Sequence, residues 1–435
     1  MLVLIAIVAG CLSVFAQAPA AKPAPTLASP LNEHLPAWLR FGGEVRSRVE
    51  GFGGGAYRFD NSDGYMLSRL RINMLVQPAP WLKLFAQGQD AHAFGKNQQP
   101  PRPPFQDSMD LRQAYLELGG TENKTVGLRV GRQEMAFGEE RMIGPANWVN
   151  TPVHFDAARG SIRHGRYRLD AFAASVVVVG DGQFNKRLDG NNIHGLYGSI
   201  GELIPKSVLE PYVLWRLAPR VITELGPPGK MDFFTYGFRW AGKLAGDYEY
   251  GVEAAIQRGS LGSDRMEAWG SHWQLGRTFS QWTTKPRIYG EYNYGSGDAD
   301  PRDGKRGTFD TLYATPHDRW GLADQVGWRN LHHARGALEA KVALAWTIKA
   351  SYHSWWLASS RDGLYLPNGA LFIRVPDGSA GRHVGQEFDA QAVWTPVRGW
   401  MVNLGYAHIV PGEFLKKATP GNSYNFPYVM AIYTF

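Results

Sequence analysis

The chain has 435 residues, a formal net charge of +7 at pH 7 and a mean hydropathy of −0.30. It contains 51 glycines, 15 tryptophans and 13% aromatic residues, and it is too long for one compact soluble core of common size, although no domain seam is visible. After residue 20, no stretch approaches the roughly 20 uninterrupted apolar residues that a spanning helix needs, so any membrane crossing must use strands.

The chain begins with an apolar segment that ends in small residues. Residues 1–16 are predicted to be a secretory signal cleaved after Ala16 or Ala18, although the usual basic start is missing. Cys11 is the only cysteine; the stretch that ends in it, Val8 to Cys11, loosely resembles a lipoprotein box, but cleavage there would leave a very short hydrophobic run. Residues 17–37 are rich in Pro and Ala and predict a flexible periplasmic lead-in.

From Leu39 onward the chain alternates between apolar and polar residues in segments of about ten. In the segment 68–76, Leu70, Ile72, Met74 and Val76 take one face, and arginines take the other. Two further segments, 248–257 and 387–394, repeat this pattern with Tyr or Trp at their ends. Faces this apolar suit lipid and aromatic belts better than water, so residues 38–435 are predicted to form a transmembrane barrel.

Turn-rich breaks separate these segments and alternate between short and long. Short breaks fall near 78–80, 120–123, 164–165, 205–206, 245–246, 284–286, 343–345 and 396–398. Long breaks fall near 51–63, 94–108, 135–154, 179–191, 218–231, 259–265, 297–334, 358–383 and 411–424. Together they predict an all-β, antiparallel up-and-down barrel of about 18 strands around a water-filled lumen, with short turns and both termini in the periplasm.

The C-terminal segment 425–435 is an aromatic strand that ends in Phe435. Val429, Ala431, Tyr433 and Phe435 share one face at period two. A closing strand of this kind is typical of outer-membrane barrels and predicts recognition of Phe435 by the barrel insertion machinery. We therefore expect the chain to lie in the lipid of a bacterial outer membrane.

The basic residues are mostly arginines, 32 Arg against 14 Lys, which favours recognition of carboxylate or phosphate groups. On the face expected to line the lumen, the candidate substrate-binding residues are Arg46, Arg48, Arg69, Arg71, Arg129, Arg239, Lys341 and Lys349. About half of such arginines are expected to pair with wall carboxylates such as Glu44, Glu117 and Glu249. The remaining positive charge predicts a preference for anions.

Seven stretches resemble the alginate export family of outer-membrane barrels, and they are spread over essentially the whole mature length. They are YMLSRLR at 65–71, LRQAYLEL at 111–118, GLRVGRQEMAFG at 127–138, ADQVGWRN at 323–330, YHSWWL at 352–357, RHVGQEFD at 382–389 and GYAH at 405–408. The resemblance implies an 18-stranded barrel, acting as a monomer and with possible periplasmic export partners, that passes an anionic polyuronate through a constriction lined by arginine and lysine. Arg69, Arg71 and Arg129 match best, whereas Arg132 has the wrong parity for the lumen unless a bulge intervenes.

A general diffusion porin with a modest anion preference is the alternative, and a barrel enzyme is a more distant one. The histidines His332, His333, His353, His383 and His408 lack the spacing of a zinc hydrolase. His383 and Glu387 would share a strand face about 13 Å apart, too far for one metal ion. We therefore predict no catalytic residue, metal, cofactor or nucleic-acid partner.

Three further expectations concern the loops and the lumen. The Asp-rich segments 180–182 and 297–304 do not follow the EF-hand pattern and are expected to be ordinary turns. The loop 297–334 is long enough to fold into the pore as a constriction or plug. A closed structural barrel would need bulky apolar residues in its lumen, and the Gly, Asn, Gln and charged residues of the predicted inner face argue against that.

Overall fold

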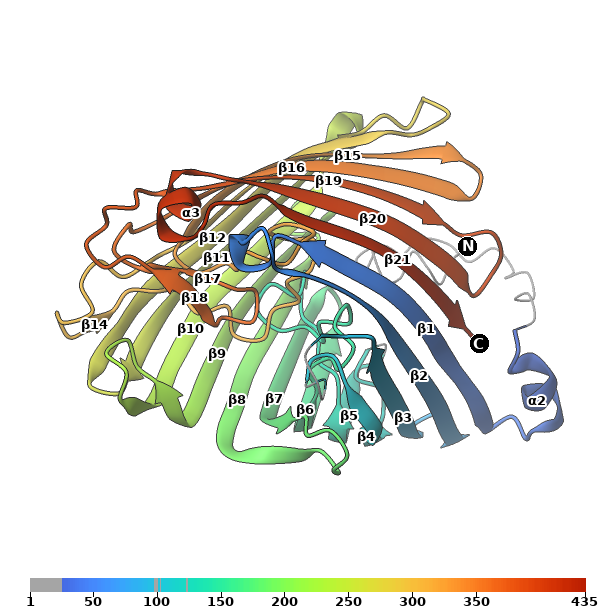
Figure 1. Ribbon diagram of the computed structural model, residues 1–435. Coiled ribbons are helices and arrows are strands. Elements are labelled where there is room, and N and C mark those ends of the chain that lie inside the picture. The colour runs from blue at the N-terminus through green and yellow to red at the C-terminus, as the bar shows by residue number, and fades with distance from the viewer. Residues whose placement is uncertain (1–25, 98–100, 102, 123) are drawn as a thin grey trace.

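The computed structural model describes residues 26–97, 101, 103–122 and 124–435. The expected signal, and residues 17–25 of the expected lead-in, lie outside the described residues. Within them, 18 antiparallel strands form a closed barrel, because the first strand pairs with the last as well as with the second. Figure 1 shows the barrel from the side, with the long loops at one end and the C-terminus at the other. The predicted fold class is confirmed.

The barrel strands follow one another around the wall in chain order. They are β1 (Leu39–Gly53), β2 (Ser62–Ala79), β3 (Leu82–Phe94), β4 (Asp107–Leu118), β5 (Val126–Gln133), β6 (Phe155–His164), β7 (Tyr167–Val178), β8 (Lys186–Gly201), β9 (Ser207–Ile222), β10 (Pro228–Lys243), β11 (Tyr248–Leu261), β12 (Asp264–Thr278), β13 (Arg287–Gly295), β15 (Leu331–Ala343), β16 (Trp346–Leu357), β19 (His383–Trp394), β20 (Trp400–Pro411) and β21 (Tyr424–Thr434).

Smaller elements lie outside the wall sequence. They are the helices α2 (Ser29–His34) and α3 (Glu413–Ala418), the 3-10 turns η1 (Gly55–Tyr57) and η2 (Ala245–Asp247), the short strand β14 (Lys305–Arg306) and the hairpin of β17 (Gly363–Tyr365) with β18 (Leu371–Arg374). Helix α2 belongs to the expected lead-in and is tied to β1, since the Asn32 side chain both accepts from Phe41 N at 2.8 Å and donates to Phe41 O at 2.7 Å.

The predicted breaks coincide with the connections between strands, short and long in alternation. The differences are of extent: β8 already begins at Lys186, β9 runs to Ile222 and β10 resumes at Pro228. Polar residues there continue the strands beyond the apolar zone, so composition alone placed these long breaks too wide. Long loops on one side and short turns on the other orient the barrel, with the short-turn end toward the periplasm.

The outer face is apolar and carries aromatic side chains near both ends. Trp346 stacks on Trp394 and Trp400 packs on Tyr433 at the short-turn end, with ring centroids 5.7 and 4.8 Å apart. Trp269 and Tyr294 meet at 4.3 Å at the other end. Two such belts are typical of a barrel in a bilayer. Among the described residues, no helix has the length and apolarity that would let it cross a membrane.

The inner face has two zones, which differ from the uniformly polar lining expected from the sequence. Toward the short turns it is charged. Toward the long loops it is apolar: wall residues such as Phe155, Phe233 and Trp355 are buried with loop residues such as Phe309 and Trp320 in one core. The alternating pattern did not reveal this core, because it is completed by loop residues that have no strand periodicity.

Candidate functional site

Two long loops fold into the lumen and meet there. The first inner loop, residues 134–154, connects β5 to β6, and the second, residues 296–330, connects β13 to β15. Their backbones pair directly: Gly144 N donates to Tyr313 O at 2.8 Å and Tyr313 N donates to Met142 O at 2.9 Å. The second loop also touches the inner wall, where Glu387 accepts the Ala323 N–H at 2.9 Å. The expectation that the loop 297–334 folds into the pore is confirmed, and it shares that position with the first loop.

Arginines of β1 and β2 hold the tip of the first inner loop. Arg46 donates to Asn147 O at 2.9 Å, to Trp148 O at 3.0 Å and to the Asn150 side chain at 2.8 Å. Arg69 donates to Asn147 O and Val149 O at 3.0 and 3.1 Å while it pairs with Glu44 at 2.6 Å. Two of the predicted lumen arginines therefore use their guanidinium groups as loop anchors.

Arg48 and Arg71 complete this anchor on the same wall. Arg48 pairs with Glu50, donates to Trp148 O at 2.6 Å and lies 3.7 Å from the centroid of the Trp148 ring. Arg71 donates to the side chains of Gln89 and Asn147 at 2.8 and 3.1 Å. Both are buried, at 2% and 6% exposure, so little of either cation reaches the open lumen.

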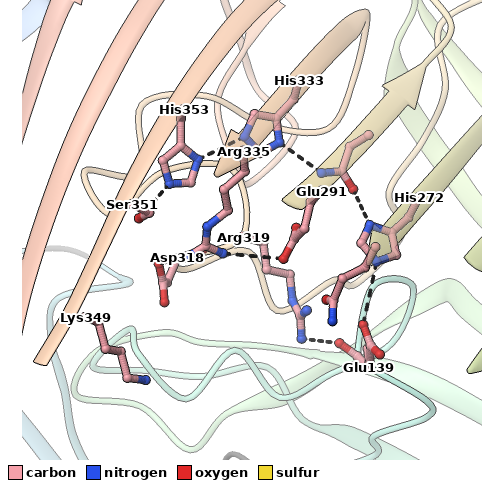
Figure 2. Close-up of polar contacts among 12 residues, drawn as sticks. Glu139, His272, Glu291, Asp318, Arg319, His333, Arg335, Lys349, Ser351 and His353 are labelled. Carbon is pink, nitrogen blue, oxygen red and sulfur yellow. Dashed lines mark hydrogen bonds and ion pairs between the residues drawn. The ribbon is translucent and has the colours of Figure 1, made fainter. Parts of the chain in front are cut away.

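Arg239 anchors the same loop on the opposite wall. It pairs with Glu139 of the loop at 2.8 Å and with Glu210 of β9 at 2.6 Å. Burial alone would raise the pKa of Glu139, but Arg239 and Arg141 hold it well below its ordinary value. Arg319 of the second loop donates to the Glu139 carbonyl, a contact visible in Figure 2. The two inner loops are thus tied to each other and to both walls, and we call this structure the crossbar.

A chain of polar side chains on the wall supports the crossbar (Figure 2). Asp318 of the second loop binds Arg335 of β15 at 2.9 Å, and Arg335 also approaches Glu291 at 3.7 Å. Above them, Asn293 Nδ2 donates to His333 at 3.0 Å, and His333 meets His353 at 2.9 Å.

The hydrogen-bond directions in this chain are mutually consistent. Because the Asn293 amide donates to His333 Nδ1, His333 Nε2 carries a proton and donates to His353 Nδ1. His353 Nε2 then donates to the Ser351 hydroxyl at 3.1 Å and to Asp389 at 3.0 Å. Both imidazoles are fully satisfied while neutral. All four ring nitrogens are therefore occupied by hydrogen bonds to wall side chains.

The other predicted site residues lie nearer the short-turn end and are more accessible. Arg129 pairs with Glu117 at 2.5 Å and keeps 12% of its side chain exposed. Lys349 lies 3.7 Å from Glu339 with 28% exposure, and Lys341 is exposed at the end of β15. Lys349 also lines a cavity of about 30 Å³, together with Asp318, Arg335 and Ser351. The structure thus separates the eight predicted residues into five anchors and three accessible cations.

Arg112 of β4 and Glu134 of the first inner loop also hold the crossbar, and neither was predicted as a site residue. Arg112 pairs with Glu134 and donates to Pro152 O at 2.8 Å, and it reaches the lumen because the pairing of β3 with β4 shifts register there. Burial opposes ionisation of Glu134, yet Arg112 and Arg71 lower its pKa. Neither the loop positions nor the register shift leaves a periodic signal that could have identified these residues.

Two predictions about the strand face that a side chain occupies have different outcomes. Arg132 lies off the lumen and pairs with Asp156 of β6 at 2.8 Å, in agreement with its parity. His383 and Glu387 do not share a face, because the register shifts where β19 pairs with β16 and Gly385 has a φ of +151°. His383 packs on Trp356 on the outside, whereas Glu387 is buried inside. Within the part of the chain that the structure describes, no group of three or more His, Cys, Asp or Glu side chains is arranged to hold a metal.

Comparison with protein families identifies the family of this barrel. The model of the alginate export family matches residues 37–429. The chain belongs to the alginate export family. This confirms the resemblance found in the sequence, and the family and fold together place the protein in the bacterial outer membrane as a porin-like barrel. No curated protein matches the chain.

Solved structures of outer-membrane proteins share the fold of this alginate-export-family barrel. The Pseudomonas aeruginosa protein OpdK has a TM-score of 0.61 at 11% identity, covering 91% of this chain and 98% of its own. OccK11 (OpdR) from the same organism gives 0.60 at 11% identity, with 91% and 96% covered. Acinetobacter baumannii OccAB4 gives 0.60 at 9% identity, with 91% and 98% covered. At these identities the likeness concerns the fold alone.

Proposed function

We propose that this barrel is a channel for acidic solutes, with alginate-like polyuronates as the preferred class. The observation that carries the proposal is the surplus of cations on the inner wall of the short-turn half. Inward positions there hold Lys83, Arg129, Arg159, Arg168, Lys243, Arg287, Lys341 and Lys349 against Glu117, Asp170, Glu249 and Glu339. Glu122 of the adjoining short turn also pairs with Arg159 and Arg168, at 3.2 and 3.3 Å, and the cations still outnumber the carboxylates. A lumen of this sign concentrates anions ahead of the crossbar.

The pairing of these cations with carboxylates suits passage rather than tight binding. Glu117 accepts from both Lys83, at 3.2 Å, and Arg129. A uronate carboxylate that approaches Arg129 competes with Glu117, so each contact is weak and is released as the next one forms. A channel needs sites that are favourable enough to enter and weak enough to leave.

The five anchors enter this proposal in an indirect role. Arg46, Arg48, Arg69, Arg71 and Arg239 define where the crossbar stands and hence the width of the path, while Arg129, Lys341 and Lys349 meet the solute. A general diffusion porin with a modest anion preference is the second candidate, since the same wall charge would favour any small anion. We propose no catalytic activity.

Reconstitution in planar bilayers tests the proposal. In a salt gradient, the reversal potential is expected to show anion selectivity, and oligouronates added to one side are expected to block the current. A neutral glucan oligomer of equal length, the matched control, should block much less. Anion selectivity without oligouronate block would favour the general porin, and a cation-selective pore would contradict both candidates.

A further inference from the structure

A shallow groove lies on the outer surface of the barrel, at the end that carries the long loops. It has a volume of about 380 Å³ and is lined by Tyr292, His332, Trp356 and Arg382. The strand neighbours Asn293, His333 and Trp355 are fully buried on the lumen side, and successive residues of a strand face opposite ways. The groove therefore faces lipid, at the level of the outer leaflet.

Arg382 supplies a cation at the upper edge of the groove. Its Nε donates to Leu357 O at 2.8 Å, and its Nη2 donates to Ala358 O at 2.7 Å and to His332 Nε2 at 3.2 Å. Among the described residues, no carboxylate pairs with it, and its Nη1 has no hydrogen-bond partner. Arg382 is thus held in place by neutral acceptors while its charge and two N–H donors remain available.

A second donor follows from the same contacts. Since Arg382 can only donate, His332 Nε2 is the acceptor of their bond, and the His332 proton lies on Nδ1. Nδ1 meets the Tyr292 hydroxyl at 2.7 Å, so Tyr292 accepts there and its own O–H points to no described partner. The groove therefore presents an arginine and a phenolic hydroxyl, one on each side of His332, to an anionic head group.

The surroundings of the groove are apolar and aromatic. Trp356 is 38% exposed on the outer face, and Tyr294 lies beside His332 with ring centroids 4.9 Å apart. Four residues from Trp356 along β16, further into the membrane, Tyr352 packs against Phe388 on the same outer face, with ring centroids 5.1 Å apart. An occupant must therefore carry an anion at its head and hydrocarbon below it.

We propose that this groove binds lipid A, the phosphorylated acyl glycolipid of the outer leaflet. A phosphate of the head group lies against Arg382 Nη1, another head-group oxygen accepts from the Tyr292 hydroxyl, and an acyl chain lies along Trp356, Tyr352 and Phe388. Arginine binds phosphate oxygens through paired N–H groups, and a hydrogen bond to a charged group is stronger than a neutral one. A free phosphate would leave the aromatic wall unused, so the groove fits a lipid better than an inorganic ion.

The test uses the full barrel in detergent, titrated with hexa-acyl diphosphoryl lipid A and observed by native mass spectrometry. The wild-type protein is expected to retain lipid A, and R382Q is expected to bind it about tenfold more weakly. Y292F is expected to weaken binding by a smaller factor. Equal binding by wild type and R382Q would overturn the proposal.

The matched control is Arg258, an exposed arginine on the outer face near the long-loop end of β11, which lies opposite Glu267 in register. R258Q removes the same charge and should bind lipid A like the wild type. An equal loss in R258Q would mean general anion attraction and overturn the site.

Because R382Q also removes hydrogen bonds to the backbone of Leu357 and Ala358, the ligand must be varied as well as the protein. Dephosphorylated lipid A should bind the wild type about tenfold more weakly, and undiminished binding would refute the phosphate contact. Phosphatidylglycerol that bound as tightly as lipid A would refute the assignment to lipid A.

Discussion

Trp148 of the first inner loop stacks on His317 of the second, with ring centroids 3.6 Å apart and planes within 4°. The same indole has the Arg48 guanidinium 3.7 Å from its centroid. One side chain thus joins β1 to both halves of the crossbar, so the position of each loop depends on the other.

Replacing Trp148 by Ala should loosen the crossbar. The stacking and cation–π contacts together contribute about 1–3 kcal/mol, and their loss should let the loop tips move apart. We expect a larger and noisier single-channel conductance in planar bilayers, with the barrel intact. Trp282, which is 57% exposed in the short turn between β12 and β13, is the control: W282A should conduct like the wild type. An unchanged conductance in W148A would show that Trp148 does not set the width of the path.

The anchors and the accessible cations should respond in opposite ways to substitution. R69Q leaves Glu44 and two loop carbonyls without their buried partner, and breaking a buried pair costs about 3–5 kcal/mol. K349Q breaks only a half-exposed pair with Glu339, which contributes about 0–1 kcal/mol. Urea-induced unfolding should therefore show a large loss of stability for R69Q and little for K349Q.

In measurements of ion selectivity, substitution of the accessible lysines should have a larger effect than substitution of the anchor Arg69. The reversal potential of K349Q, and of the double variant K341Q/K349Q, should shift toward cations, because these side chains are exposed on the inner face of the barrel. A variant such as R69K, which keeps the charge of the anchor, should retain the wild-type reversal potential. If K341Q/K349Q kept the wild-type reversal potential, the accessible lysines would have no part in selectivity.

Closure of the barrel should be sensitive to Gly43. Phe435 N donates to Gly43 O at 3.0 Å, Gly43 N donates to Phe435 O at 2.8 Å, and a Cβ on Gly43 would lie 2.6 Å from the Phe435 ring and 2.4 Å from Arg71 O. G43A should cost about 1–3 kcal/mol through overpacking at the seam. Heat-modifiable migration on gels measures the folded fraction. Gly53 of the same strand has nothing within 4 Å of its added Cβ, so G53A should fold normally; equal folding of both variants would contradict the seam contact.

The packing of the β17–β18 hairpin at the long-loop end should depend on pH through Glu224, which pairs with Arg374 of β18. This carboxyl pairs with Arg306 and with Arg374, the latter at 3.0 Å, yet burial, with help from Asp298 and Asp362, raises its pKa to about 7 from the ordinary 4.5. Because the folded state holds the proton more tightly, the stabilisation is complete below pH 4.5 and is lost as the pH rises through about 7.

Limited digestion by proteinase K at several pH values measures this stability. The segment 358–382 should be cut more slowly at pH 5.5 than at pH 8 in the wild type. In E224Q, which cannot ionise, the ratio of its cleavage rate to the wild-type rate should fall as the pH rises, since only the wild type is weakened. A ratio that stays constant from pH 5.5 to 8 would refute the role of Glu224.

The wall of the barrel could be predicted from the sequence, because strand alternation and turn composition are local signals. The outward parity of Arg132 and the inward parity of Arg239 were both predicted in this way, and each pairs on its predicted side. The register shift near Gly385 shows the limit, since one extra residue there moved His383 to the other face.

The role of the arginines could not be predicted in the same way. Arg46 binds the backbone of residues about a hundred positions away, and no pattern along the chain marks such a pair. An inward arginine that holds a loop and one that stays accessible in the lumen occupy the same position in the alternating pattern of the strand. Only the fold of the two inner loops distinguishes Arg46 and Arg69 from Arg129 and Lys349.

The burial of the crossbar anchors should make the position of the crossbar insensitive to salt. Dissolved ions screen exposed charge pairs over about 10 Å at 0.1 M salt but reach buried pairs much less. Arg46, Arg69 and Arg239 are 2%, 3% and 5% exposed, so the crossbar should keep its position in dilute and in concentrated media. The crossbar should therefore stay in place at any salt concentration, while the electrostatic field of the exposed lysines weakens as salt rises. Salinity would tune how readily the channel is entered without altering how wide it is.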